Sequence, residues 1–313
     1  MSTVGGLGEF GLIDAVTTRF PQAGAVLVGP GDDAAVLRTG DGRVVATTDL
    51  LTEEQHFRRA WSSGYDVGRK AAAQNLADVA AMGAVPTALL VGLAAPPDLE
   101  TAWVLELADG LRDESAPLGA SVVGGDVTRA DVITVAVTAL GDLQGRQPVR
   151  RRGARVGDVV AVAGRLGWSA AGHAVLSRGL AGPRVLVEAH LRPRPPYSAG
   201  PAAADLGATA MIDVSDGLVQ DLGHVAVASG VEIALDARVF DISAPLAEAG
   251  RALGADPVPW VLGGGEDHAL AATFPPGRDL PGEWRVVGRV TEGEGVSVDG
   301  EPWAGAAGWA HFA

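Results

Sequence analysis

The chain has 313 residues, of which 47% are hydrophobic, and it carries a formal net charge of -14 and no cysteine. The negative charge argues against binding to nucleic acid or to an anionic membrane surface, and the lack of cysteine excludes disulfides, thiolate metal sites and cysteine nucleophiles. The length suits two domains, and because we find neither a signal peptide nor a long uncharged apolar run, we predict a cytoplasmic protein.

The first part of the chain shows alternating helical and strand patterns. A hairpin turn is predicted at residues 39–42, because Asp41-Gly42 is a strong hairpin signal between two short apolar runs. In chain order the predicted elements are a helix over 8–20, strands over 34–38 and 44–48, a helix over 64–82, a strand over 87–93, a helix over 98–116, and strands over 121–123 and 132–140.

A polar, turn-rich segment at residues 141–148 predicts a domain boundary, which gives domains 1–145 and 146–313. Beyond it the predicted elements are a strand over 159–163, helices over 168–178, 184–190 and 198–206, a strand over 210–213, a helix over 218–228, and strands over 231–235, 269–274 and 285–290. Helices and strands alternate without the strict repeat of a parallel barrel. We therefore predict two α+β domains in which mixed sheets pack against helices.

Acidic residues recur where predicted strands end in loops, most of which contain glycine. The five places are Gly31-Asp32-Asp33, Thr47-Thr48-Asp49, Gly124-Gly125-Asp126, Asp213-Val214-Ser215-Asp216-Gly217 and Gly264-Gly265-Glu266-Asp267. Loops at strand ends commonly carry functional sites. Mg²⁺ prefers oxygen ligands and is usually held by a few carboxylates together with substrate phosphates. Because glycine also lets the backbone approach a phosphate closely, the pattern predicts magnesium-assisted phosphate chemistry.

Two polar residues, Asn75 and Asp78, share one face of the predicted helix over 64–82 because they are three positions apart. Their neighbours are apolar, so a buried and unpaired Asp78 would be costly and a bound metal would remove that cost. The chain lacks a P-loop, a protein-kinase H-R-D set, an H-E-x-x-H motif and a G-x-S-x-G motif. Any bound nucleotide must therefore be neutralised by metal, arginine and backbone N–H groups.

Motifs along almost the whole chain match one family in order and spacing. They are GPGDDAAVL (29–37), TD and HF within 48–57, KAAAQNLADVAAMGAVP (70–86), GGDVTR (124–129), HLRP (190–193), IDVSDGLVQDLGH (212–224), GGGED (263–267) and GWAHFA (308–313). With these motifs the chain resembles the thiamine-monophosphate kinases, which belong to the aminoimidazole ribonucleotide synthetase-like superfamily. The resemblance implies a two-domain α+β fold and a homodimer formed through the N-terminal sheets.

The resemblance also implies the reaction: ATP and several Mg²⁺ ions convert thiamine monophosphate to thiamine diphosphate, in the final step of thiamine diphosphate biosynthesis. The transfer would be direct and in line, without a covalent protein nucleophile, and it would require no strong general base because the acceptor phosphate is already ionised near pH 7. The implied magnesium ligands are Asp33, Thr47, Thr48, Asp49, Asp78, Asp126, Asp213 and Asp216. The implied ATP contacts are Gly125, Asp126, Arg151 and Ser215, and those of thiamine monophosphate are His56, Glu266 and Trp309.

The chain departs from the family pattern at three positions. His268 stands where Tyr or Phe usually follows Gly-Gly-Glu-Asp, Pro196 replaces the final arginine of Arg-Pro-x-Pro-Arg, and Thr47 replaces a serine. Pattern reasoning alone does not decide which of Arg150, Arg151 and Arg152 meets ATP. His173, His190 and His224 are interpreted as structural.

Other interpretations of these residues stay open. Thr47 and Thr48 fit as ordinary strand residues, Ser215 as a helix N-cap, Trp309 as core packing and His56 as a surface histidine. Two rival functions also remain: ring closure with ATP by a superfamily relative, and a non-catalytic sensor of nucleotide or divalent ions.

Overall fold

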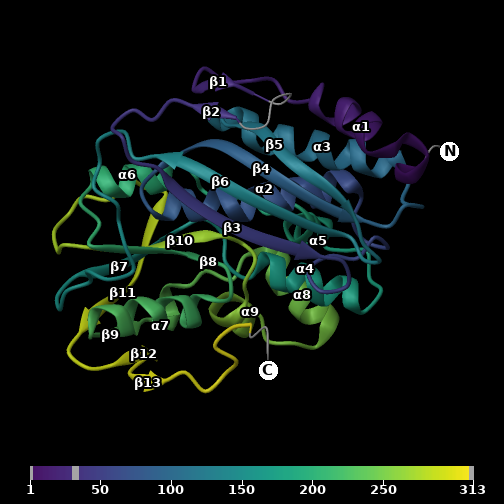
Figure 1. Cartoon of the computed structure of the whole chain (residues 1–313). Coiled ribbons are helices and arrows are strands. Elements are labelled where there is room, and N and C mark those ends of the chain that lie inside the picture. Colours follow the sequence, from purple (N-terminus) through teal and green to yellow (C-terminus); the bar gives the residue numbers. More distant parts are fainter. Residues whose placement is uncertain (1–2, 30–34, 310–313) are drawn as a thin grey trace. The chain divides into compact units, whose positions relative to one another are not determined.

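The computed structural model describes residues 3–29 and 35–309, except for the side chains of residues 5 and 8–10. The chain divides into two compact units (Figure 1): Met1–Val79 with Ala84–Gly145, and Ala80–Gly83 with Arg146–Ala313. Each unit has its own mixed sheet packed with helices. This architecture confirms the predicted α+β class.

The first unit is built on a four-stranded mixed sheet in the order β3-β6-β4-β5, beside a small sheet of β1 and β2. β3 and β4 each pair antiparallel with β6, and β5 runs parallel to β4. The elements are α1 (Val4–Thr17), β1 (Val26–Val28), β2 (Val36–Leu37), β3 (Val45–Thr52), α2 (Gly64–Ala81), β4 (Val85–Ala95), α3 (Thr101–Ser115), the short 3-10 helix η1 (Ala116–Leu118), β5 (Ser121–Arg129) and β6 (Thr134–Asp142).

One face of this sheet forms the core of the first unit. Val135 and Val137 are fully buried, whereas the residues that alternate with them on β6 are half-exposed, as expected of a strand with one covered face. Helices α2 and α3 approach so closely that a side chain at Gly68 or at Gly110 would overlap the backbone of the other helix. The close approach holds α2 in place as a platform for polar side chains.

The second unit is built on a seven-stranded sheet in the order β13-β12-β9-β11-β7-β10-β8, in which β12 and β9 form the one parallel pair among the described strands. The elements are β7 (Val159–Ala163), α4 (Trp168–Ser177), α5 (Arg184–Leu191), α6 (Ala199–Asp205), β8 (Ala210–Val214), α7 (Leu218–Ser229), β9 (Glu232–Leu235), the 3-10 helix η2 (Ala237–Val239), α8 (Ala244–Leu253), α9 (Val258–Gly263), β10 (Ala269–Phe274), β11 (Trp284–Thr291), β12 (Gly295–Val298) and β13 (Glu301–Pro302).

The edge strand β8 and its neighbour β10 are buried along their whole length, which shows that both faces are covered at this end of the sheet. Alternate residues supply two apolar clusters. Ile212 and Ala271 pack with residues of α4, α7, α8 and α9, while Met211 and Ala272 pack with residues of α6. The chemically interesting loops therefore start from a rigid sheet.

The predicted hairpin at residues 39–42 is wrong. β2 pairs with β1, and β3 pairs over eight residues with β6, so the two strands that we expected to pair do not. Asp41 still lies where the chain bends. Its carboxylate accepts hydrogen bonds from the N–H groups of Arg43 and Gly145. The longer pairing of β3 with β6 overrides the local Asp-Gly signal. In the part of the chain that the structure describes, no helix is long and apolar enough to cross a membrane.

Candidate functional site

In the first unit, polar side chains of α2 meet the edge strand β3. The Thr47 hydroxyl donates a hydrogen bond to Asp78 Oδ2 at 2.7 Å, and the Asp49 N–H donates to Asn75 Oδ1 at 3.0 Å. Asn75 is completely buried and donates to the carbonyl of Ala71 on its own helix. These contacts confirm that Asn75 and Asp78 share one face of the helix, and they bring Asp78 to Thr47 and the adjoining Asp49.

Thr48 lies on the opposite face of β3, because successive side chains of a strand alternate. Its hydroxyl donates to the carbonyl of Val137 and accepts from the hydroxyl of Thr138 on β6, each at 3.1 Å. The hydroxyls of Thr47 and Thr48 therefore point to different environments, and only that of Thr47 belongs to the cluster with Asp78.

Gly125 and Asp126 are exposed on β5, which is the other edge strand of the sheet. Three strand spacings separate β5 from β3, or about 14 Å at the usual strand distance. A side chain at Gly125 would overlap the carbonyl of Val91 on the paired strand, so only glycine fits. Within one chain, Asp126 is thus remote from the Thr47–Asp78 pair. The predicted ligand Asp33 lies outside the described residues.

His56 lies in the turn that follows β3. Its Nδ1 accepts a hydrogen bond from the Thr52 N–H at 3.0 Å, which places the proton of the neutral ring on Nε2. The carbonyl of His56 accepts a hydrogen bond from the buried Lys70 ammonium at 3.2 Å. Both contacts hold the histidine in a fixed orientation, unlike a freely rotating surface residue.

In the second unit, the carboxyl end of β8 leads into an acidic loop. Asp213 is buried and lies 3.0 Å from Nδ1 of the equally buried His268. His268, which stands where the family usually has Tyr or Phe, thus forms a polar pair with Asp213. Neither Asp213 nor His268 is left without a partner at this buried position.

The loop after Asp213 is closed by the first turn of α7. The N–H groups of Asp216 and Gly217 both donate to Asp221 Oδ2 at 3.0 Å, and the Gln220 amide donates to Asp216 Oδ2 at 3.0 Å. Burial raises the pKa of Asp221 to about 7, and the neighbouring carboxylates of Asp213 and Asp216 add to this increase. The interpretation of Ser215 as an N-cap is wrong, because Gly217 holds that position.

Residues 264–268 form a strained loop beside β8. The N–H of Glu266 donates to the Ser215 carbonyl at 2.8 Å, and the N–H of His268 donates to the Val214 carbonyl at 3.1 Å. Glu266 and His268 have positive φ angles of 63° and 52°, which are uncommon for residues other than glycine and cluster at functional sites. Between them, the buried Asp267 accepts hydrogen bonds from the N–H groups of Trp168 and Ser169.

Trp309 is not core packing, because it is 60% exposed. Its N–H donates to the Asp216 carbonyl at 3.1 Å, and its own carbonyl accepts the Gln220 amide at 2.8 Å. The exposed indole is thereby tied to the same acidic loop. Arg150, Arg151 and Arg152 are all exposed. Their exposure therefore does not show which of them would meet ATP.

The donor sets of both units suit magnesium, since the cluster of Thr47, Asp49 and Asp78 and the loop with Asp213 and Asp216 supply only oxygen from their side chains. No group of three or more His, Asp or Glu side chains within residues 3–29 and 35–309 is arranged to hold a metal ion. A magnesium ion bound here would take part of its shell from water and phosphate, as is usual for this ion.

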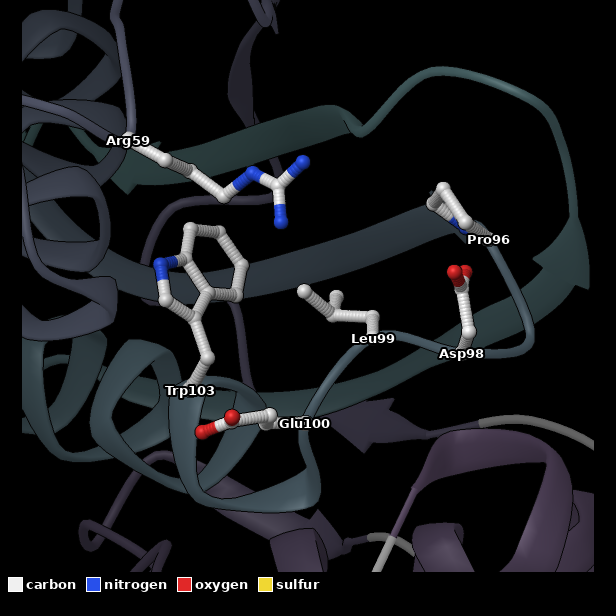
Figure 2. A pocket seen from close by; sticks show the side chains of 6 residues that line it. All are labelled: Arg59, Pro96, Asp98, Leu99, Glu100 and Trp103. Carbon is white, nitrogen blue, oxygen red and sulfur yellow. The ribbon is translucent and has the colours of Figure 1, made fainter.

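A separate pocket of about 370 Å³ lies in the first unit at the start of α3. Figure 2 shows the Trp103 ring, Leu99 and Pro96 around it, with the Arg59 guanidinium and the carboxylates of Asp98 and Glu100 at its margin. None of the residues predicted for the site lines this pocket. Sequence reasoning gave no signal for it.

Comparison with known proteins places this geometry in a family. Residues 31–143 match the family model described as AIR synthase related protein, N-terminal domain. This part of the chain is therefore an AIR synthase related N-terminal domain, and the two-unit α+β fold agrees with that class.

Full-length relatives narrow the class. The chain is 52% identical over 308 residues to the thiamine-monophosphate kinase of Mycobacterium tuberculosis, with 98% of this chain and 92% of the relative covered. It is 42% identical to that of Corynebacterium glutamicum, with coverage of 99% and 95%. The chain belongs to the thiamine-monophosphate kinase family and is a kinase of that family.

Solved structures agree with this assignment. The thiamine-monophosphate kinase of Stenotrophomonas maltophilia superposes with a TM-score of 0.82 at 34% identity and covers 93% of this chain and 96% of its own. The structure of AaThiL complexed with AMPPCP and TMP gives a TM-score of 0.82 at 35% identity, with coverage of 100% and 99%. The family resemblance predicted from the motifs is confirmed.

Proposed function

We propose that this enzyme transfers the γ-phosphoryl group of ATP directly to the phosphate of thiamine monophosphate, which yields thiamine diphosphate and ADP as the final step of thiamine diphosphate biosynthesis. An acceptor phosphate oxygen attacks the γ-phosphorus as the bond to the β–γ bridging oxygen breaks in line. The acceptor is ionised near pH 7, so no protein base is required. The observation that carries the proposal is the oxygen cluster of Thr47, Asp49 and Asp78 in a chain 52% identical to a thiamine-monophosphate kinase.

Both units contribute ligands for several magnesium ions. Those of the first unit are Asp33, Thr47, Thr48, Asp49, Asp78 and Asp126, and those of the second unit are Asp213 and Asp216. Magnesium bound there would offset the charge of the two phosphate groups that must approach each other. The protein's own contribution is position: hydrogen bonds of 3.0 Å at Asp49 and at Asp213 hold these residues before any substrate arrives.

Nucleotide and acceptor have separate contacts in the proposal. Gly125 and Asp126 on β5, together with Ser215 and Arg151, bind ATP. His56, Glu266 and Trp309 bind thiamine monophosphate, whose aromatic rings can stack on the 60% exposed indole of Trp309. The backbone contact between Trp309 and Asp216 links the acceptor contact to a proposed magnesium ligand. We keep the cytoplasm as the predicted compartment.

We also propose a homodimer formed through the first unit. Its sheet has an outward face where Leu50 is 57% and Leu90 is 37% exposed, with Thr48 and Thr138 in register beside them. Thr48 and Asp126 lie on opposite edge strands, about 14 Å apart by strand spacing, and so cannot bind one ion within a chain. In the proposed dimer a second copy covers this face and presents its Asp126 to Thr48 on β3 of the first.

Mixed dimers test this arrangement. Thr48→Val and Asp126→Asn are each expected to lower activity by at least about tenfold, whereas co-expression of the two should restore about a quarter of wild-type activity, because half of the dimers are mixed and hold one intact site. A monomeric mass in solution, or no recovery in mixed dimers, would contradict the dimer proposal and leave the reaction itself untouched.

The reaction is tested by incubation of the protein with ATP, Mg²⁺ and thiamine monophosphate, with thiamine diphosphate and ADP followed by chromatography. We expect equal amounts of both products, and loss of both on chelation of magnesium. Asp78→Asn should lower the formation of both products. Asp131→Asn, at an exposed turn of the same unit, is its matched control and should match the wild type. Hydrolysis of ATP without thiamine diphosphate would move the assignment to another acceptor, and intact ATP would move it to a sensor.

A further inference from the structure

We propose that His190 is a positioning residue for substrate recognition, which together with Ser169 holds the carboxylate of Glu266 in its binding orientation. His190 Nδ1 lies 3.3 Å from Glu266 Oε2 and 3.1 Å from the hydroxyl of Ser169. The Ser169 hydroxyl in turn lies 3.5 Å from the same Glu266 oxygen. The proposal rests on the proposed function, in which Glu266 contacts thiamine monophosphate.

Burial distinguishes the two holding residues from the residue that they hold. Ser169 is fully buried and the His190 side chain is 7% exposed, whereas the Glu266 side chain is 38% exposed. One carboxylate oxygen is thus fixed from within the protein, while the side chain still reaches solvent. Thiamine monophosphate carries an amino group and a thiazolium cation, and a carboxylate accepts from the first and pairs with the second.

The elements around this contact are themselves fixed. A side chain at Gly172 on α4 would overlap the Leu186 carbonyl on α5 and crowd His190, so glycine allows the approach that brings His190 to Ser169. Asp267 accepts the Ser169 N–H at 3.0 Å and so fixes the start of α4. The residue that follows Glu266 therefore also positions one of its two partners.

The backbone of Glu266 adds a second constraint. Its φ of 63° is a strained conformation that persists only where the surroundings impose it, and its N–H is held by the Ser215 carbonyl at 2.8 Å. With backbone and carboxylate both held, less rotamer freedom is lost when the substrate binds. Loss of His190 should therefore weaken the binding of thiamine monophosphate more than that of ATP.

Steady-state kinetics of four variants test the inference. His190→Phe keeps a ring without the Nδ1 donor, whereas His190→Asn keeps a donor near the same position. We expect His190→Phe and Ser169→Ala to raise KM for thiamine monophosphate by about tenfold and about threefold, with KM for ATP changed less than about twofold. His190→Asn should restore most of the loss. His224→Phe, exposed on α7 of the same unit, is the control and should match the wild type.

A double-mutant cycle shows whether His190 acts through Glu266. In a Glu266→Gln background, His190→Phe should change KM for thiamine monophosphate by less than about twofold, because the group that it positions is already altered. Additive effects, an unchanged KM in His190→Phe, or equal increases of both KM values would overturn the inference. Crystal structures of the wild type and His190→Phe give a readout independent of turnover, and an unmoved Glu266 carboxylate would also overturn it. Failure of the wild type to form thiamine diphosphate would instead refute the proposed function.

Discussion

The acidic residues of the two units are held in different ways. In the first unit, Asp78 and Thr47 meet because a helix packs on a sheet, so regular secondary structure alone brings them together. In the second unit, Asp213 and Glu266 lie in or beside loops, and each is held by a histidine. Regular elements therefore suffice to place the acidic residues of the first unit, whereas those of the second unit require strained loops and additional polar partners.

Removal of the carboxylate charge in the regular cluster should have the largest effect. Asp78→Asn preserves size and can still accept the Thr47 hydroxyl, so we expect a stable protein whose kcat falls by at least about 100-fold, a typical loss when a group that stabilises developing charge is removed. Thr47→Val, which removes only the hydroxyl, should cost less. Measurement of kcat at saturating magnesium checks both.

An Asp78→Asn variant with more than about a tenth of wild-type kcat would show that the cluster is structural and takes no part in the reaction. Asp131→Asn gives the baseline for loss of an exposed acid in the same unit.

The loop cluster should respond to pH through Asp267. Burial raises its pKa from 3.8 to about 7, against the opposing effect of the Ser169 and Trp168 N–H groups and of His268. The folded protein therefore keeps this proton to higher pH than the unfolded chain does. Its contribution to the free energy of unfolding is fully present below about pH 4 and falls as pH rises to about 7, by at most about 4 kcal/mol.

Asp267→Asn removes this titration. The free energy of unfolding of the wild type relative to Asp267→Asn should decrease between pH 4 and pH 7 and stay constant above pH 7, as measured by urea unfolding at each pH. A difference that is constant over the whole range would show that Asp267 ionises normally in the fold.

Regular secondary structure can be predicted from the sequence, whereas contacts between distant loops cannot. Asn75 and Asp78 could be predicted from helical spacing, because a period of 3.6 residues fixes which side chains share a face. The predicted strands over 159–163 and 269–274 have the same bounds as β7 and β10. The contact between Glu266 in a loop and His190 on α5 joins residues 76 positions apart, and no local pattern encodes it.

A further failure has a physical cause of the same kind. The hairpin at residues 39–42 failed because β3 pairs with β6, which lies about 90 residues away, over eight positions. A long-range strand pairing here outweighs the local turn signal.

The close approach of the loop to β8 can be tested at Gly265. A side chain there would overlap the Ser215 carbonyl, and this backbone atom cannot move without breaking the hydrogen bond that it accepts from Glu266. We expect Gly265→Ala to lower the free energy of unfolding by about 2–3 kcal/mol and to raise KM for thiamine monophosphate. Thermal and urea unfolding give the first value, and steady-state kinetics gives the second.

Gly223→Ala is the matched control for Gly265→Ala, and we expect its effect to be the smallest and of opposite sign. Gly223 lies within α7 of the same unit, and a side chain there would meet no atom within 4 Å. Alanine favours the helix and reduces the freedom of the unfolded chain, so Gly223→Ala should raise the free energy of unfolding by about 0.5–1 kcal/mol without changing either KM. If Gly223→Ala and Gly265→Ala were equally destabilising, the loss at Gly265 would reflect a general intolerance of the unit. Opposite signs would instead locate the constraint at the contact between the Glu266 loop and β8.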